Sequence, residues 1–180
     1  MVGGPVLANI QQVVLEHWDT AQPLDEAGFF PPLSKQGEQF VRVISTPASK
    51  RKNTDSPYYL TLVAAIETAE SHIVLNSAYF VPTEAQEDAL VAAADRGVKV
   101  SLLVPSISDS RLAINVQRSH YTRLLEHGIE IYEMQDQILH AKVISIDGVW
   151  SVIGSSNFDY RSAGINAEID VVIFDNQTAK

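Results

Sequence analysis

Residues 140–157 read His-Ala-Lys-Val-Ile-Ser-Ile-Asp-Gly-Val-Trp-Ser-Val-Ile-Gly-Ser-Ser-Asn. Two β-rich runs, 141–146 and 149–153, flank Asp147-Gly148 in this stretch. Asp-Gly between alternating apolar residues is a strong signal for a two-residue β-hairpin turn, in which both turn residues have positive φ. The stretch therefore predicts two antiparallel strands joined by a tight turn.

The turn sets the register of the two strands. With a two-residue loop, Ile146 pairs with Val149, and this register places His140 opposite Ser155. Side chains two residues apart share one face of a strand. We therefore expect four polar side chains to converge at one end of the hairpin: His140, Lys142, Ser155 and Asn157.

Asp147 and Gly148 lie at the other end of the hairpin. Asp147 is separated from His140 by about 23 Å of extended chain, at about 3.3 Å per residue. Asp-Gly is also the residue pair that a tight turn with positive φ favours. We therefore expect Asp147 and Gly148 to form a structural turn, away from the group that His140 contacts.

The converging imidazole, ammonium, hydroxyl and amide suit a phosphodiester. A neutral imidazole can attack phosphorus or pass a proton, and N–H donors stabilise charge on phosphoryl oxygens. This chemistry needs no metal and no cofactor, and the chain has no cysteine or second histidine at zinc-ligand spacing. A serine hydrolase elbow is excluded because GxSxG would need a glycine where Phe158 stands.

The rest of the chain divides into three parts. Residues 1–21 contain apolar positions at helical spacing and predict an amphipathic helix. Residues 22–38 are rich in proline and glycine without a period, which indicates a linker. Residues 39–180 form the main domain.

Helix and strand signals alternate along the first part of this domain. Gly97 and Gly128 each end a helical stretch and precede a buried strand. The repeated order of helix, glycine and strand predicts an α/β fold, a layered mixed sheet flanked by helices. Capping residues mark three helix starts: Ser56 with Pro57, Thr83 with Gln86, and Asp109 or Ser110.

Charge and hydropathy limit the possible partners. The formal net charge is −9, which works against salt-dependent attraction to a phosphate backbone, so nucleic acid is not an expected partner. The longest apolar stretches, such as residues 89–94, are far shorter than the roughly 20 residues of a membrane-spanning helix. We expect this chain by itself to be soluble.

The spaced motif resembles the HKD motif of the phospholipase D superfamily. His140-Ala141-Lys142, four residues, Asp147, six residues and Gly154-Ser155-Ser156-Asn157 match HxK(x)4D(x)6GSxN at every specified position. The resemblance covers nearly all of residues 39–175. Segments such as 79–82 and 157–162 are similar to the second half of bacterial cardiolipin synthases.

This resemblance implies a phosphatidyltransferase that works in two steps through a phosphohistidine. Two HKD motifs face each other in such enzymes, and His140, in what resembles the second motif, would act as the acid and then the base. Lys142 and Asn157 would bind the phosphoryl oxygens with assistance from Ser155. Glu168 would hydrogen-bond His140 and orient its ring.

The chain holds one HKD motif, so the resemblance implies half of the catalytic machinery. The other half would lie in the same parent chain, with residues 1–21 the remnant of a preceding domain and the main domain truncated at its C-terminus. The substrates would be a phospholipid and an alcohol acceptor, phosphatidylglycerol or glycerol. The parent protein would lie at the bacterial cytoplasmic membrane with its catalytic part facing the cytoplasm.

Two other functions stay open. Two copies of a single-motif chain could form a homodimeric phosphodiesterase or nuclease, or the isolated half could be inactive and bind only lipid or a partner. Tyr79 and Phe80 follow a predicted strand and are candidates for a substrate groove, with a place in the core as the equal alternative. The remaining histidines are expected to be structural or exposed: His17, His72, His120 and His127.

Overall fold

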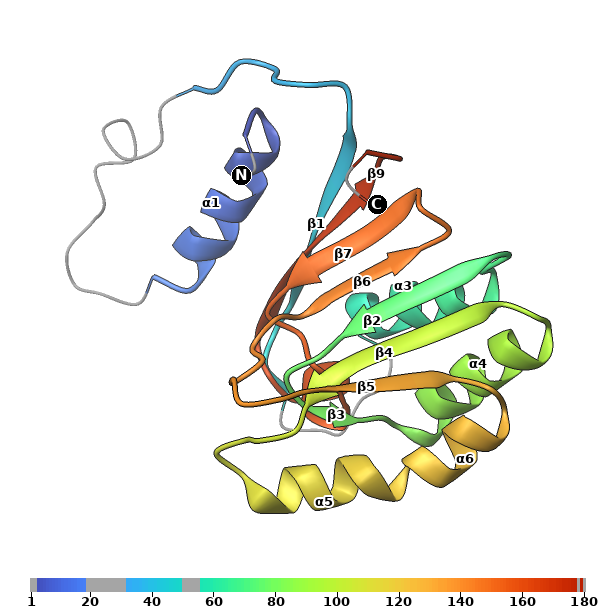
Figure 1. Ribbon diagram of the computed structural model, residues 1–180. Coiled ribbons are helices and arrows are strands. Elements are labelled where there is room, and N and C mark those ends of the chain that lie inside the picture. The colour runs from blue at the N-terminus through green and yellow to red at the C-terminus, as the bar shows by residue number, and fades with distance from the viewer. Residues whose placement is uncertain (1–2, 19–31, 50–55, 178, 180) are drawn as a thin grey trace.

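The computed structural model describes residues 3–18, 32–49, 56–177 and 179. A seven-stranded mixed sheet with the order β1-β9-β7-β6-β2-β4-β5 forms its centre (Figure 1). Helices flank this sheet, which confirms the predicted α/β fold. The strands of the sheet are β1 (Phe40–Thr46), β2 (His72–Asn76), β4 (Lys99–Pro105), β5 (Glu130–Met134), β6 (Val143–Ile146), β7 (Trp150–Gly154) and β9 (Glu168–Phe174).

The strand directions divide the sheet into two parts. β2, β4 and β5 are parallel to one another. β6 pairs antiparallel with β2, and the remaining neighbours β6-β7, β7-β9 and β9-β1 are also antiparallel. A separate parallel pair joins β3 (Phe80–Val81) to β8 (Phe158–Asp159). The site segments after Asn76, before Val143 and after Gly154 therefore meet at one edge of the sheet.

Six helices are described, and capping residues begin several of them as predicted. Ser56 Oγ accepts from Tyr59 N at 3.2 Å with proline in the first turn, and Thr83 with Gln86 forms a complete capping box. Ser110 Oγ accepts from Ala113 N at 3.2 Å. The helices are α1 (Val6–Glu16), α3 (Pro57–Glu67), α4 (Glu84–Asp95), α5 (Arg111–Ser119), α6 (Tyr121–Glu126) and α7 (Tyr160–Gly164).

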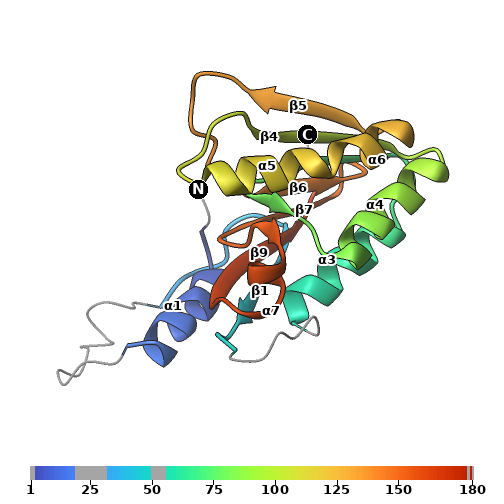
Figure 2. The same ribbon diagram turned by 90° about the horizontal axis from the view of Figure 1, so that it is seen from below.

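The hydrophobic core lies between one face of the sheet and the helices α3 and α4, which share one side of it in both views (Figure 1 and Figure 2). Alternate strand residues such as Ile73, Leu75 and Leu102 are fully buried there. Leu62 and Ile66 come from one face of α3, as their helical spacing predicts. Burial of such side chains stabilises the fold by roughly 1.5–3 kcal/mol each.

Helix α1 lies against the opposite face of the sheet. A cavity of about 760 Å³ separates α1 and the segment 35–39 from Val41, Ile153 and Ile173. The predicted end of this helix at residue 21 and the first part of the linker lie outside the described residues. Among the helices that the structure describes, none is long and apolar enough to cross a membrane.

The hairpin register differs from the predicted one by a single residue. The predicted Asp-Gly turn is present, with φ of 54° at Asp147 and 66° at Gly148. Ile146 nevertheless pairs with Trp150 in the ladder rather than with Val149. Val149 accepts from Asp175 N at 2.9 Å through its carbonyl oxygen, beyond the end of β9. The predicted pairing of Ile146 with Val149 is therefore wrong, because Val149 is an extra residue outside the ladder.

The single helix predicted between Ser110 and Gly128 is divided in two. The helix breaks at His120, between α5 and α6. At this break the His120 ring meets Phe80 edge to face, and His120 Nδ1 lies 2.7 Å from Glu87 Oε2 on α4. The histidine thus connects the two helices to the core, in agreement with its predicted structural role.

Candidate active site

The carboxyl ends of β2 and β4, the start of β6 and the end of β7 bring the predicted site residues to one edge of the sheet. Open α/β sheets bind ligands at the carboxyl ends of their parallel strands. β6 begins at Val143 and β7 ends at Gly154, so the four motif side chains lie just beyond the ladder. The simple two-residue alternation of an extended hairpin therefore does not set their directions.

His140 and Lys142 lie together on the segment before β6. Lys142 Nζ is 3.3 Å from each ring nitrogen of His140 and donates to the His140 carbonyl oxygen at 3.1 Å. The His140 side chain is exposed. Burial lowers the pKa of Lys142, while the negative charges of Glu168 and Asp159 act in the opposite direction. Lys142 thus lies within electrostatic reach of the Glu168 carboxylate.

Glu168 is held by side chains on its own side of the site. Ser155 Oγ donates to Glu168 Oε2. Ser162 Oγ donates to Glu168 Oε1 at 2.8 Å, and Asn166 Nδ2 donates to the same oxygen at 3.1 Å. The residue is 9% exposed. In the described part of the chain no hydrogen bond joins Glu168 to His140. The Glu168 carboxylate therefore binds Ser155, and the hydrogen bond expected between Glu168 and the His140 imidazole stays a prediction.

Asn157 sits between this cluster and the core. Its backbone N–H donates to Ser162 Oγ at 3.1 Å, which links it to the serine that binds Glu168. Its side-chain Oδ1 is buried and has no hydrogen-bond partner among the described residues. This oxygen is an acceptor, so only a ligand that brings an O–H or N–H donor would satisfy it.

Sequence reasoning missed a buried carboxylate beneath this site. Asp170 accepts from Ser156 Oγ at 2.6 Å and from Ser156 N at 3.2 Å. Burial raises the pKa of Asp170 to about 6. A Cβ at Gly154 would stand 2.1 Å from Asp170 Oδ1, so the glycine of the motif leaves room for this carboxylate. The two-residue spacing from Glu168 to Asp170 on β9 is the signal that would have found it.

Asp147 lies at the far end of the hairpin, as predicted from the chain length. Its carboxylate accepts hydrogen bonds from the backbone N–H groups of Glu70, Ser71 and His72 at 2.8 to 2.9 Å. These bonds lower its pKa to about 2 against the opposing effect of burial. Asp147, the aspartate of the HKD motif, therefore attaches the hairpin turn to the start of β2 by hydrogen bonds.

The two residues that were candidates for a substrate groove lie in different environments. Phe80 is fully buried and stacks on Phe158 with ring centroids 5.4 Å apart. Phe80 is thus a core residue, which is the second of the two alternatives left open for it. Tyr79 is half-buried and lines a cavity of about 180 Å³ that also borders His140. Among the described residues, no group of acidic or histidine side chains could hold a metal ion.

Comparison with known proteins identifies relatives of this chain. Residues 62–180 match the family described as cardiolipin synthase, PLD-like domain. Cardiolipin synthase A of Proteus mirabilis is 41% identical over 115 residues, covering 64% of this chain and 24% of the relative. Cardiolipin synthase A of Serratia proteamaculans is 31% identical over 179 residues, covering 96% of this chain and 36% of the relative. The chain therefore spans about a quarter to a third of the length of these curated relatives.

A solved structure shares the fold. The phospholipase D family member Nuc from Salmonella typhimurium superposes with a TM-score of 0.65 and 27% sequence identity. The match covers 79% of this chain and 88% of that structure. The family match extends over more than half of the chain and includes the whole HKD motif. The chain belongs to the cardiolipin synthase, PLD-like domain family.

Proposed function

We propose that this chain supplies one half of a phosphatidyl-transfer site of the cardiolipin synthase type. One observation carries the proposal: His140 and Lys142 lie together at the end of the sheet that also holds Ser155, Asn157 and Glu168, and Lys142 is within electrostatic reach of Glu168. The chain has a single HKD motif. A cation, N–H donors and one imidazole suit a phosphodiester. A second imidazole is needed for a covalent exchange and would come from another HKD half.

The proposed reaction has two steps. In the first, a histidine of the other half attacks phosphorus, a P–N bond forms, the P–O bond to the leaving alcohol breaks, and protonated His140 gives that alcohol its proton. In the second, the acceptor alcohol gives its proton to neutral His140 while its oxygen attacks phosphorus and the P–N bond breaks. Each proton that His140 releases is thus recovered, and the first histidine is regenerated.

Three groups stabilise the charge on the phosphoryl oxygens in this mechanism. Lys142 provides a positive charge next to His140, and the side-chain amide of Asn157 supplies N–H donors through its Nδ2. Ser155 would assist by turning its hydroxyl proton, which goes to Glu168 Oε2 in the structure, toward a phosphoryl oxygen. Glu168 acts as a positioning residue that accepts from the His140 ring when substrate is bound. Such preorganised donors contribute about 3–4 kcal/mol each to the transition state.

The relatives support the proposed substrates. Proteins named cardiolipin synthase match nearly the whole chain, which supports a phospholipid donor and an alcohol acceptor, phosphatidylglycerol or glycerol. The site then works at a bacterial cytoplasmic membrane on the cytoplasmic side. A net charge of −9 gives no support to nucleic acid as a substrate.

Mixing experiments test the proposal. The purified chain is incubated with phosphatidylglycerol vesicles, alone and with a separately purified HKD half, and cardiolipin and free glycerol are measured. We expect no product from the chain alone and product in proportion to the complementary half added. Absence of product at every ratio of the two halves would contradict the proposal.

A homodimeric phosphodiesterase is the second candidate. The observation that favours it is the match to the Salmonella structure, 88% of which is covered by this chain. A phospholipase D family member can therefore have a chain of nearly this length. Two copies would then place two His140 rings at one site. The same assay distinguishes this case, because the chain alone would be active and its specific activity would fall on dilution.

A further inference from the structure

The cavity next to His140 is separate from the phosphoryl-binding cluster. It is about 180 Å³ and is bounded by the segments that follow β2 and β4 and the segment that precedes β6. Pockets for drug-sized ligands are about 300–1,000 Å³, so this cavity is smaller than those. The cavity therefore suits a small headgroup rather than an acyl chain, and His140 forms part of its wall.

The polar wall of this cavity presents hydrogen-bond acceptors. Tyr79 donates its phenolic proton to Asp109 Oδ1, and Ser108 Oγ donates to the same oxygen at 3.0 Å. Both side-chain donors thus use Oδ1, which leaves Oδ2 without a side-chain donor in the described chain. The hydrogen bond from Tyr79 lowers the pKa of Asp109 and raises the pKa of Tyr79. A ligand in the cavity must therefore bring its own O–H or N–H donors.

An anionic ligand does not fit here. Asp109 is exposed and ionised at neutral pH, and a phosphate beside a carboxylate is repelled. The phosphoryl group belongs with Lys142 and Asn157, so the cavity is left for the uncharged part of a substrate. Ile107 and Ile138 complete the wall and offer apolar contact to carbon atoms.

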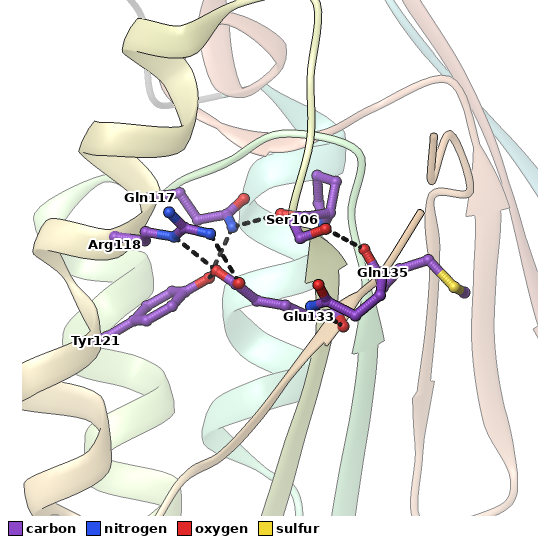
Figure 3. Close-up of polar contacts among 8 residues, drawn as sticks. Ser106, Gln117, Arg118, Tyr121, Glu133 and Gln135 are labelled. Carbon is purple, nitrogen blue, oxygen red and sulfur yellow. Dashed lines mark hydrogen bonds and ion pairs between the residues drawn. The ribbon is translucent and has the colours of Figure 1, made fainter. Parts of the chain in front are cut away.

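The loop that carries Asp109 is firmly attached at its base (Figure 3). Ser106 Oγ donates to the Met134 carbonyl oxygen at 2.6 Å, and Gln117 Nε2 donates to the Pro105 carbonyl oxygen at 3.0 Å. Arg118 forms two bonds to Glu133 at 2.8 and 2.9 Å. Helix α5 and strand β5 thus hold the start of the loop at Pro105 and Ser106.

We propose that Tyr79 and Asp109 bind the hydroxyl groups of the acceptor alcohol and hold its attacking oxygen next to His140. The ligand class is a small vicinal polyol, glycerol or the glycerol headgroup of a phospholipid. This assignment rests on the proposed transfer reaction, in which His140 takes a proton from the acceptor. Glycerol has a hydroxyl for each acceptor group and a third for His140. A glycerol headgroup esterified to phosphate has two hydroxyls, so it meets one acceptor while the other faces His140, and a monohydric alcohol that faces His140 meets neither.

Binding of glycerol can be measured without catalysis. The ¹⁵N-labelled chain is titrated with glycerol, and amide shifts are followed at Tyr79, Asp109 and His140. We expect saturable shifts for the native chain and at least a tenfold higher apparent Kd for Asp109→Asn, which replaces an acceptor oxygen by an N–H donor. Asp136→Asn, a change in an exposed loop, is the matched control and should bind glycerol as the native chain does. The same spectra show whether each variant is folded.

Several outcomes would overturn the assignment. These are glycerol shifts that do not saturate, equal affinity in Asp109→Asn, or propan-1-ol binding as tightly as glycerol. Choline binding in place of glycerol would also reject it, since it would identify a cation site.

A second measurement separates this assignment from the proposed reaction. With a complementary HKD half, the phosphatidyl group partitions between glycerol and water, and Asp109→Asn should lower the transfer-to-hydrolysis ratio at least tenfold relative to Asp136→Asn. An unchanged ratio in a chain that transfers would refute the acceptor site alone. Saturable glycerol binding without any transfer would instead refute the reaction.

Discussion

The carboxylate of Asp147 accepts a hydrogen bond from the backbone N–H of Ser71 at 2.8 Å, across 76 residues of sequence. The neighbouring N–H groups of Glu70 and His72 bind the same side chain at 2.9 Å each. Three amides at the start of β2 are thus satisfied by one residue of the hairpin turn. The HKD motif therefore combines two different tasks, chemistry at His140 and attachment of the hairpin at Asp147.

Replacement of Asp147 by alanine should lower the free energy of unfolding by about 2 kcal/mol at pH 7, because it leaves the three amides unpaired. The folded pKa of about 2 lies below the ordinary value of 3.8. The stabilisation is therefore present above about pH 4 and is lost as the pH falls toward 2. Urea unfolding of the native chain and Asp147→Ala between pH 2 and 7 measures the difference.

Asp136 provides the control for this change. Asp136 also has a positive φ, 58°, and its side chain is exposed. Asp136→Ala therefore measures the cost of placing alanine at a position of positive φ in another loop. A loss in Asp147→Ala no larger than that in Asp136→Ala would show that the three amide bonds do not stabilise the fold.

Gly154→Ala should destabilise the chain by about 3 kcal/mol or more, since overpacking at a rigid site is costly. Its Cβ would lie 2.1 Å from Asp170 Oδ1 and 2.6 Å from the Ile169 carbonyl oxygen. At Gly97, with φ of 93°, nothing stands within 4 Å of an added Cβ. Gly97→Ala should therefore cost only the backbone strain, about 1–2 kcal/mol. Unfolding in urea compares the two, and a smaller loss at Gly154 would rule out the close approach of Asp170.

Asp170→Asn should remove part of the pH dependence of stability. The buried carboxyl has a folded pKa of about 6 against an ordinary 3.8, so the native chain binds this proton more tightly than the unfolded chain. The contribution of Asp170 to the free energy of unfolding is then largest below about pH 4 and falls by about 2–3 kcal/mol as the pH rises through 6. The amide of the variant does not ionise, and the difference in unfolding free energy between the two proteins should change over this interval. A constant difference from pH 4 to 7 would contradict the burial of an ionisable group here.

Much of the fold could be predicted because its signals are local. The capping residues Ser56 and Thr83 begin helices as expected, and Gly97 and Gly128 have the positive φ that ends a helix. The hairpin turn is also local. The exact register was missed because Val149 is held outside the ladder by Asp175, a contact with a distant strand end that no turn rule contains.

The site was predictable only in part, for a related reason. The spacing of the motif identified His140 and Lys142, which do lie together. The sequence left Phe80 open between a groove and the core, because an aromatic residue after a strand looks the same in sequence in either place. Its burial depends on stacking against Phe158, which comes from the separate β3-β8 pair.

The central claim is that His140 is one of two histidines at a phosphodiester site. The most direct test is the rate of phosphatidyl transfer by His140→Ala, mixed with a complementary HKD half and compared with His127→Ala, whose histidine pairs with Asp95 at 2.7 Å. We expect a loss on the order of a thousandfold for His140→Ala and none for His127→Ala, as removal of a general acid-base predicts. Full transfer activity in His140→Ala would contradict the assignment.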